Sequence, residues 1–236
     1  MRLNLIYYGK HDVACDARIY RIHPDYIIGN PPHGLWGEIS GNGNQDLLQN
    51  VAGFQEEGIK VIGYITAGYE GMHSSGAIGP YWYSLGLNKK LIRSMAQIDH
   101  VDGVFIDECS AYPDKHAKRY LKELTDFAKS YDLVTWGNVG KNWFAPWFFT
   151  EGGFDRMQST EDWHGQPLTR VQSEYNTRIS VTGFKPSYTA QDALRLTTNA
   201  WRKGLAYCYI NNTEYNTIAL WFEEFISLIR HIELVF

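Results

Sequence analysis

The chain has 236 residues, of which 44% are hydrophobic and 20% are charged, and its formal net charge is −4 at pH 7. This composition is typical of a globular protein with a substantial core and excludes a disordered chain. Because there is no basic excess to attract phosphate groups, nucleic acid is not an expected partner, and no apolar stretch reaches the about 20 residues that a membrane-spanning helix needs.

The cysteines and the N-terminus say little about the compartment. Cys15, Cys109 and Cys208 are far apart, so at least one is unpaired within a monomer, and none has the spacing of a metal site. The first residues enter a strand-like pattern almost at once, after an apolar run too short for a signal peptide. We therefore expect either a cytoplasmic protein or one whose leader was removed, and the oligomeric state stays open.

Eight short, β-rich apolar runs alternate with segments of helical period. This rhythm predicts repeated βα units and a parallel sheet, and several runs are apolar on both faces, as strands covered outside and filled inside should be. We predict a single α/β domain over residues 1–236, a (β/α)8 TIM barrel. Its expected strands are Leu3–Tyr8, Tyr26–Gly29, Val61–Thr66, Gly103–Asp107, Leu133–Gly137, Asp155–Ser159, Ile179–Gly183 and Ala206–Ile210.

The expected helices have apolar residues at spacings of three and four. Gly58 and Gly204 follow two of them and are predicted to be left-handed C-caps. The clearest helices are Asn44–Glu57, Lys89–Ile98, Lys115–Ser130, Ala190–Arg202 and Thr217–Ile232, and weaker patterns cover Val13–Arg21, Phe144–Phe149 and Pro167–Tyr175.

Glycine-rich loops follow the second and third expected strands. Asn30 lies in the first loop, Gly29–Gly34, and Tyr69 lies in the second, Ala67–Gly71. In parallel barrels the loops after the strands build the active site, and glycine lets the backbone approach a ligand closely. Asn30 and Tyr69 are therefore candidate substrate-binding residues, with simple tight turns as the alternative.

The fourth expected strand ends in two adjacent carboxylates, Asp107 and Glu108. Two like charges side by side raise at least one pKa, and a buried carboxylate is costly without a partner, so the pair indicates a catalytic function. A helix N-cap or a salt bridge to Lys115 or Arg119 could instead explain one of the two acids.

Glu161 follows the sixth expected strand and is the candidate second acid. Alternation places Met157, Ser159 and Glu161 on one side, so Glu161 leans into the mouth of the barrel if the other two face inward. Acids on strands separated by one strand can approach within about 5 to 9 Å, the range of glycosidase acid pairs. A solvated loop glutamate is the alternative.

Amides and aromatic residues accompany these acids. Asn138 follows strand five and Asn211 follows strand eight, and amides hydrogen-bond sugar hydroxyls. Aromatic faces can cover the apolar face of a sugar ring, although core packing is an equally good explanation for Trp136 and Tyr209. The candidate aromatic platforms are Tyr69, Trp82, Trp136, Trp163 and Tyr209.

Other chemistries lack their motifs. The eight histidines have no HxH or HExxH spacing, and the chain has no Walker loop, no GxGxxG after strand one and no GxSxG elbow. We expect no metal and no cofactor.

The strand ends together resemble the spherulin-4 family of barrel glycoside hydrolases, which is related to galactosaminogalactan hydrolases and endo-α-1,4-polygalactosaminidases. The resemblance covers most of the chain. It is carried by Ile28–Pro32, Val61–Tyr69, Asp102–Glu108, Asn138–Gly140 and Glu161.

This resemblance implies a (β/α)8 fold and hydrolysis of α-1,4-linked galactosamine or N-acetylgalactosamine polymers. By the same resemblance, Asp107 is the nucleophile and Glu161 the acid/base, with Glu108 supporting them. A poly- or oligosaccharide is then the expected partner. The alternative is a carbohydrate-binding barrel without turnover, which would lack a correctly spaced acid pair.

Overall fold

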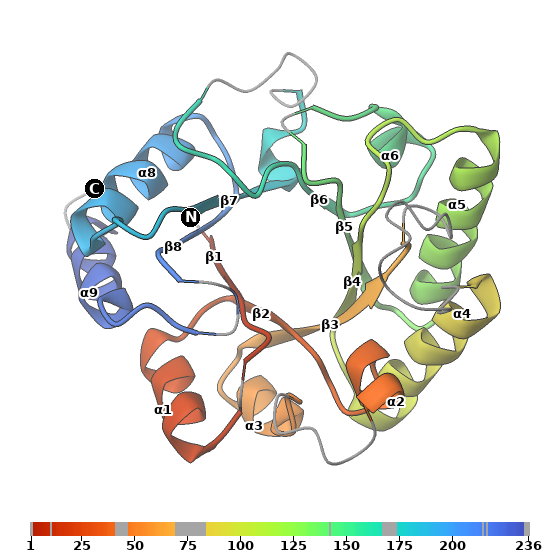
Figure 1. Cartoon of the computed structure of the whole chain (residues 1–236), viewed down its shortest axis with the longest axis horizontal. Coiled ribbons are helices and arrows are strands. Elements are labelled where there is room, and N and C mark those ends of the chain that lie inside the picture. Colours follow the sequence, from red (N-terminus) through yellow and green to blue (C-terminus); the bar gives the residue numbers. More distant parts are fainter. Residues whose placement is uncertain are drawn as a thin grey trace.

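The computed structural model describes residues 2–9, 11–40, 47–68, 84–141, 143–166, 174–213, 215 and 217–233. Eight parallel strands pair in chain order, and β8 pairs with β1 to close a barrel, with helices around the outside (Figure 1). The predicted TIM barrel is confirmed. The strands are β1 Arg2–Ile6, β2 Tyr26–Gly29, β3 Lys60–Thr66, β4 Gly103–Asp107, β5 Val134–Asn138, β6 Arg156–Gln158, β7 Ile179–Phe184 and β8 Tyr207–Asn211.

The helices lie between the strands, and none in the described part of the chain is long and apolar enough to cross a membrane. Gly58 and Gly204 have φ values of +80° and +75°, which confirms both left-handed turns. The helices are α1 Val13–Ile22, α2 Leu35–Ser40, α3 Val51–Glu56, α4 Leu85–Ser94 with a π turn Met95–Asp99, α5 Lys115–Lys129, α6 Trp147–Thr150, a 3₁₀ turn Asn176–Arg178, α8 Ala190–Arg202 and α9 Phe222–Glu233.

Three helices begin later than their patterns predicted. For α6 the reason is Pro146, since the residue before a proline avoids the helical region. For α9 it is Arg18, whose guanidinium binds the carbonyl oxygens of Ile218 and Ala219. Helix α3 begins only after Asn50, because Leu48 donates its N–H to the carbonyl of Asn30 at 2.7 Å.

Two other helices also differ from their patterns. Helix α4 begins earlier than predicted, since Ser84 caps it by accepting the N–H of Leu87. Helix α2 was not predicted. Parts of two expected helices, residues 44–46 and 167–173, lie outside the described residues.

At the N-terminal ends of the strands, an arginine packs among aromatic rings inside the barrel. Trp136 of β5 pairs in register with Arg156 of β6, so both side chains lie on one face of the sheet, and the contacts of Arg156 with rings on β2 and β8 place that face inside the barrel. The guanidinium carbon of Arg156 lies 5.2 Å from the centre of the Trp136 ring, 4.4 Å from that of Tyr26 and 4.7 Å from that of Tyr207. This cation–π cluster fills the barrel interior at the N-terminal ends of the strands. A functional site is therefore expected at their C-terminal ends.

A repeated aspartate ties neighbouring strands together at their N-terminal ends. Each of three aspartates directly precedes an even-numbered strand and accepts the backbone N–H at the start of the odd-numbered strand before it. The pairs are Asp25 with Leu3 at 2.7 Å, Asp102 with Val61 at 2.9 Å and Asp155 with Thr135 at 2.9 Å. The position before β8 is Ala206, so the last strand pair lacks this bond.

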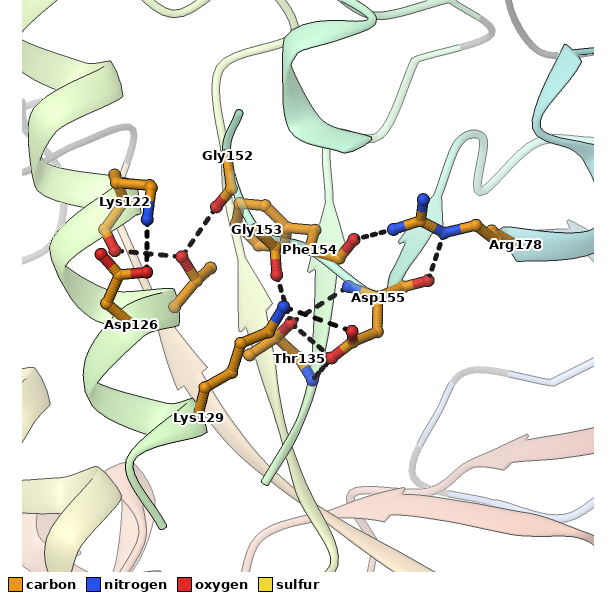
Figure 2. Close-up of polar contacts among 10 residues, drawn as sticks. Lys122, Asp126, Lys129, Thr135, Gly152, Gly153, Phe154, Asp155 and Arg178 are labelled. Carbon is orange, nitrogen blue, oxygen red and sulfur yellow. Dashed lines mark hydrogen bonds and ion pairs between the residues drawn. The ribbon is translucent and has the colours of Figure 1, made fainter. Parts of the chain in front are cut away.

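Asp155, one of these three, has contacts with several elements (Figure 2). Its Oδ2 accepts both the N–H and the hydroxyl of Thr135, at 2.9 Å each, and its Oδ1 lies 3.3 Å from the ammonium group of Lys129. Arg178 donates to the carbonyl oxygens of Asp155 and Phe154. The side chain of one residue thus joins α5, β5 and β6.

We expect Asp155→Ala to lower the free energy of unfolding by about 1–3 kcal/mol, because the N–H of Thr135 loses its side-chain acceptor and the hydroxyl of Thr135 keeps only the carbonyl of Gly153. Asp126→Ala is the matched control, since Asp126 forms only an exposed i,i+4 pair with Lys122 and should change stability by less than about 0.5 kcal/mol. Urea denaturation of both variants measures the difference. Equal stability of the two would contradict a structural function for Asp155.

Candidate active site

Two consecutive carboxylates face the open end of the barrel. Asp107 is the last residue of β4, two residues after Phe105, which pairs in register with the inward-facing Trp136, so Asp107 also faces inward. Consecutive strand residues normally point to opposite faces, but Glu108 has a φ of +56°, in the left-handed region. This turn lets Glu108 also reach the mouth, where its Oε2 accepts the hydroxyl of Thr66 at 2.7 Å.

Two of the structural explanations for these acids, a helix cap and a salt bridge to Arg119, are wrong, because other acids serve these two purposes. Asp114, rather than Asp107 or Glu108, caps helix α5 by accepting the N–H groups of His116 and Ala117. Arg119 pairs with Glu123, at 3.1 Å. The acids at the end of β4 therefore serve neither as the cap of this helix nor as partners of its arginine.

Asn138, the last residue of β5, connects the two acids predicted to be catalytic. Its Nδ2 donates to Oδ1 of Asp107 at 2.8 Å and to Oε1 of Glu161 at 2.6 Å. Its Oδ1 accepts the backbone N–H of Gly140 at 3.0 Å, and this fixes the orientation of the amide, since an N–H can only donate. Both carboxylate oxygens are bound to one nitrogen, so they are at most 5.4 Å apart, the sum of the two bond lengths.

Asp107 accepts three hydrogen bonds. Besides Asn138, the backbone N–H of Glu108 donates to Oδ1 and the hydroxyl of Tyr64 donates to Oδ2, each at 2.8 Å. Burial raises the pKa of Asp107 above its ordinary value of 3.8, and the charge of Glu108 adds to this, while the three hydrogen bonds oppose the shift. The three donors thus stabilise the negative charge of Asp107, which burial disfavours.

Glu161 has fewer donors. Burial raises its pKa above the ordinary value, the charges of Asp107 and Glu108 raise it further, and the hydrogen bond from Asn138 is the only contribution that lowers it. Of the two acids, Glu161 therefore has the weaker support for a negative charge.

Glu161 reaches the mouth by a route that differs from the predicted one. Met157 lies beside Gly137 on the outer face, and Arg156 and Gln158 face inward, so the assumed side of the strand is wrong. Strand β6 ends at Gln158, and the chain bends at Glu161, which brings the side chain back over the barrel. The next residue, Asp162, is also an acid, but its side chain is 82% exposed.

A cavity of about 160 Å³ lies over these groups. Gly140, which lines the cavity, has a φ of +58°, a backbone conformation that favours glycine. The described residues that line the cavity are Asp107, Glu108, Asn138, Val139, Gly140 and Glu161.

Tyrosines surround the acid pair, and the sequence analysis missed them. Tyr64 donates to Asp107, and the ring of Tyr8 lies 5.2 Å from that of Tyr64 and 5.9 Å from that of Tyr215. Burial raises the pKa of Tyr8 and Tyr215, and the charges of Asp107 and Glu161 add to both shifts. For Tyr64 a signal existed, since it lies two residues before Thr66 and hence on the same inner face.

Several predicted binding residues do not reach the cavity. Trp136 and Tyr209 are fully buried, so neither offers a ring face to a ligand, and their prediction as platforms is corrected to core packing. Trp163 is 1% exposed and donates its indole N–H to the carbonyl of Gln166. Asn211 is buried and donates to Tyr209, Thr213 and Thr217.

The remaining predicted residues are Asn30, Tyr69 and Trp82. Asn30 is buried and is not among the residues that line the cavity. Tyr69 and Trp82 lie outside the described residues.

One group of possible metal ligands occurs in the described part of the chain. A ligand atom from each of His11, Cys15 and Asp16 lies within 4.8 Å of the others, at the start of α1. The imidazole Nδ1 of His11 and Oδ1 of Asp16 are 3.1 Å apart. None of these three residues is among those that line the cavity over the acid pair.

The family model Spherulin4, described as spherulation-specific family 4, matches residues 21–229. No curated protein matches the chain.

Solved structures share the fold at low sequence identity. Aspergillus clavatus Sph3 in complex with GalNAc has a TM-score of 0.68 at 18% identity, over 97% of this chain and 96% of that one. A chitinase from Rhizomucor miehei has a TM-score of 0.62 at 10% identity, over 98% and 100% of the two chains. Deoxyribose phosphate aldolase from Aeropyrum pernix has a TM-score of 0.56 at 11% identity, over 96% and 90%. The chain therefore has a barrel fold that glycoside hydrolases use, and the aldolase shows that the fold alone does not decide the chemistry.

Proposed function

The chain belongs to spherulation-specific family 4, and from this premise we propose that it is a glycoside hydrolase that cleaves polymers of α-1,4-linked galactosamine or N-acetylgalactosamine. The observation that carries the proposal is the pair Asp107 and Glu161, held on one amide nitrogen with oxygens at most 5.4 Å apart, the sum of the distances 2.8 and 2.6 Å. Retaining glycosidases have carboxyl groups about 5–5.5 Å apart.

The hydrogen bonds support different functions for the two acids. Three donors favour the ionised form of Asp107, which suits a nucleophile, whereas Glu161 accepts one hydrogen bond and lies beside other negative charges. A proton shared by the cluster is therefore best placed on Glu161, which suits a general acid.

The proposed reaction has two steps. Glu161 protonates the glycosidic oxygen while a carboxylate oxygen of Asp107 attacks the anomeric carbon, so the leaving sugar departs with a new hydroxyl and a glycosyl ester forms on Asp107. Glu161, now ionised, removes a proton from water, whose oxygen attacks the same carbon and releases Asp107 as a carboxylate. Asn138 keeps the two acids in position throughout.

Two observations support an amino sugar as the substrate. Three carboxylates line the cavity, so a positively charged 2-ammonium group would be attracted to it, and Sph3, which is similar in fold, was solved in complex with GalNAc. Release of reducing ends from galactosamine and N-acetylgalactosamine polymers tests the proposal. Binding of these polymers without such release would indicate the alternative, a carbohydrate-binding barrel without turnover.

We expect hydrolysis to retain the anomeric configuration, because the close acids leave no room for a water between Asp107 and the sugar. Proton NMR of the first product, recorded before mutarotation, measures this. An α-linked substrate should give the α-anomer first. If the β-anomer appears first, Asp107 acts as a base toward water and not as a nucleophile.

A further inference from the structure

Two large aromatic side chains are exposed and in contact on the catalytic face. Tyr112 is 56% exposed and Trp143 is 49% exposed. Their ring centres are 4.7 Å apart, with planes inclined at 47°. Isolated exposed aromatics are common on protein surfaces, but two exposed rings in contact form an apolar patch that the chain has not buried.

The loops that carry these rings are two of the three that contribute residues to the lining of the cavity. Tyr112 lies between β4 and α5, four residues after Glu108, and Trp143 lies between β5 and α6, three residues after Gly140. The two loops are joined where Ala145 donates its N–H to the carbonyl of Ala111, at 2.9 Å. This backbone hydrogen bond between the two loops keeps the rings of Tyr112 and Trp143 next to each other.

Trp143 lies close along the chain to a residue that lines the cavity. Three residues span at most about 10 Å, so the Cα atom of Trp143 lies within that distance of the Cα atom of Gly140. The cavity itself, at about 160 Å³, is small for a polymer. A longer chain that enters it has to continue over neighbouring surface.

We propose that Tyr112 and Trp143 form an aromatic platform that stacks against a sugar ring of the polymer next to the rings at the acid pair. This inference rests on the proposed function and adds a second contact to it. The apolar face of a pyranose matches an exposed aromatic ring, and two rigid side chains lose little conformational freedom when they bind. The platform distinguishes long substrates from short ones.

The experiment combines substrate length with single substitutions. Trp143→Ala and Tyr112→Ala are compared with the parent on a galactosamine polymer and on a short aryl glycoside. We expect KM for the polymer to rise about tenfold, as loss of a good stacking contact would produce, with kcat and the rate on the aryl glycoside unchanged. Trp201→Ala is the matched control, because Trp201 is 43% exposed on α8, whose C-terminal end lies away from the strand ends that carry the site.

A binding measurement separates the platform from catalysis. In an Asp107→Asn background, oligosaccharides should quench tryptophan fluorescence, and adding Trp143→Ala should remove part of that signal and weaken binding about tenfold. If the parent cleaves the polymer and both platform variants behave like Trp201→Ala, the platform inference alone is wrong. If the parent neither binds nor cleaves any of these saccharides, both the platform and the proposed function are wrong.

Discussion

Replacing Asp107 by asparagine should lower kcat by about 10³-fold or more, because the amide has the shape of the carboxylate but cannot form the glycosyl ester. The substitution fits the surrounding hydrogen bonds. An asparagine oxygen can accept the N–H of Glu108 and the amide of Asn138, and its nitrogen can donate to the hydroxyl of Tyr64, which is able to accept as well as donate. Initial rates on a polymer that the parent cleaves measure the loss.

The same variant should be more stable than the parent at neutral pH. Since the folded pKa of Asp107 is raised above its unfolded value, the folded state binds more protons, and stability falls as the pH rises from about 4 through the folded pKa. The asparagine side chain in Asp107→Asn has no charge to bury, so the stabilising effect should be present at pH 7 and should disappear below about pH 4. Thermal melting at both pH values measures it.

Each expectation has its own contradicting result. Near-normal activity of Asp107→Asn would exclude Asp107 as the nucleophile. A melting temperature of Asp107→Asn below that of the parent at pH 7 would contradict the expected stabilisation, because removing a buried charge should raise it.

Replacing Glu161 by glutamine should lower kcat by about 10²- to 10⁴-fold on natural glycosidic bonds, since their leaving group must be protonated. An aryl glycoside with an acidic leaving group needs no such proton, so its first step should be nearly spared and glycosyl-enzyme should accumulate. The alkaline limb of the pH–rate profile, which reports loss of the proton from Glu161 through its raised pKa, should also vanish.

Asp162→Asn is the control for this experiment. Asp162 is the next residue, but its side chain is 82% exposed and points to His164, so its activity should stay within about twofold of the parent. A loss in Asp162→Asn as large as in Glu161→Gln, on both substrates, would show that the acid has been assigned to the wrong residue.

The acids were predictable from sequence because their signal is local. Asp107 and Glu108 end an apolar run, and in a parallel barrel the end of a strand is also the position of the site. The strands were predictable for the same reason, since each is a short apolar run between helical patterns. Asn138 was found too, although its bonds to both acids depend on distances that no spacing reveals.

The aromatic residues were harder because alternation gives the face of a strand but not the depth along the barrel axis. Trp136 is inside, as an inward strand residue should be, yet it packs with Arg156 at the N-terminal ends of the strands. Trp143 lies in a loop without periodicity, so its exposure follows only from the folded structure. Glu161 likewise depends on a bend after β6 that overrides the alternation of the strand.

The aspartates at the base of the barrel make its architecture modular. Asp25, Asp102 and Asp155 each join an odd-numbered strand to the next even-numbered one. Three of the four strand pairs are therefore linked by an aspartate side chain. These hydrogen bonds lie at the end opposite the acid pair, and none of them involves a residue of the catalytic loops. Loops at the mouth can therefore be lengthened, shortened or exchanged between relatives, and substrate preference can diverge, while each pair of strands stays joined from below.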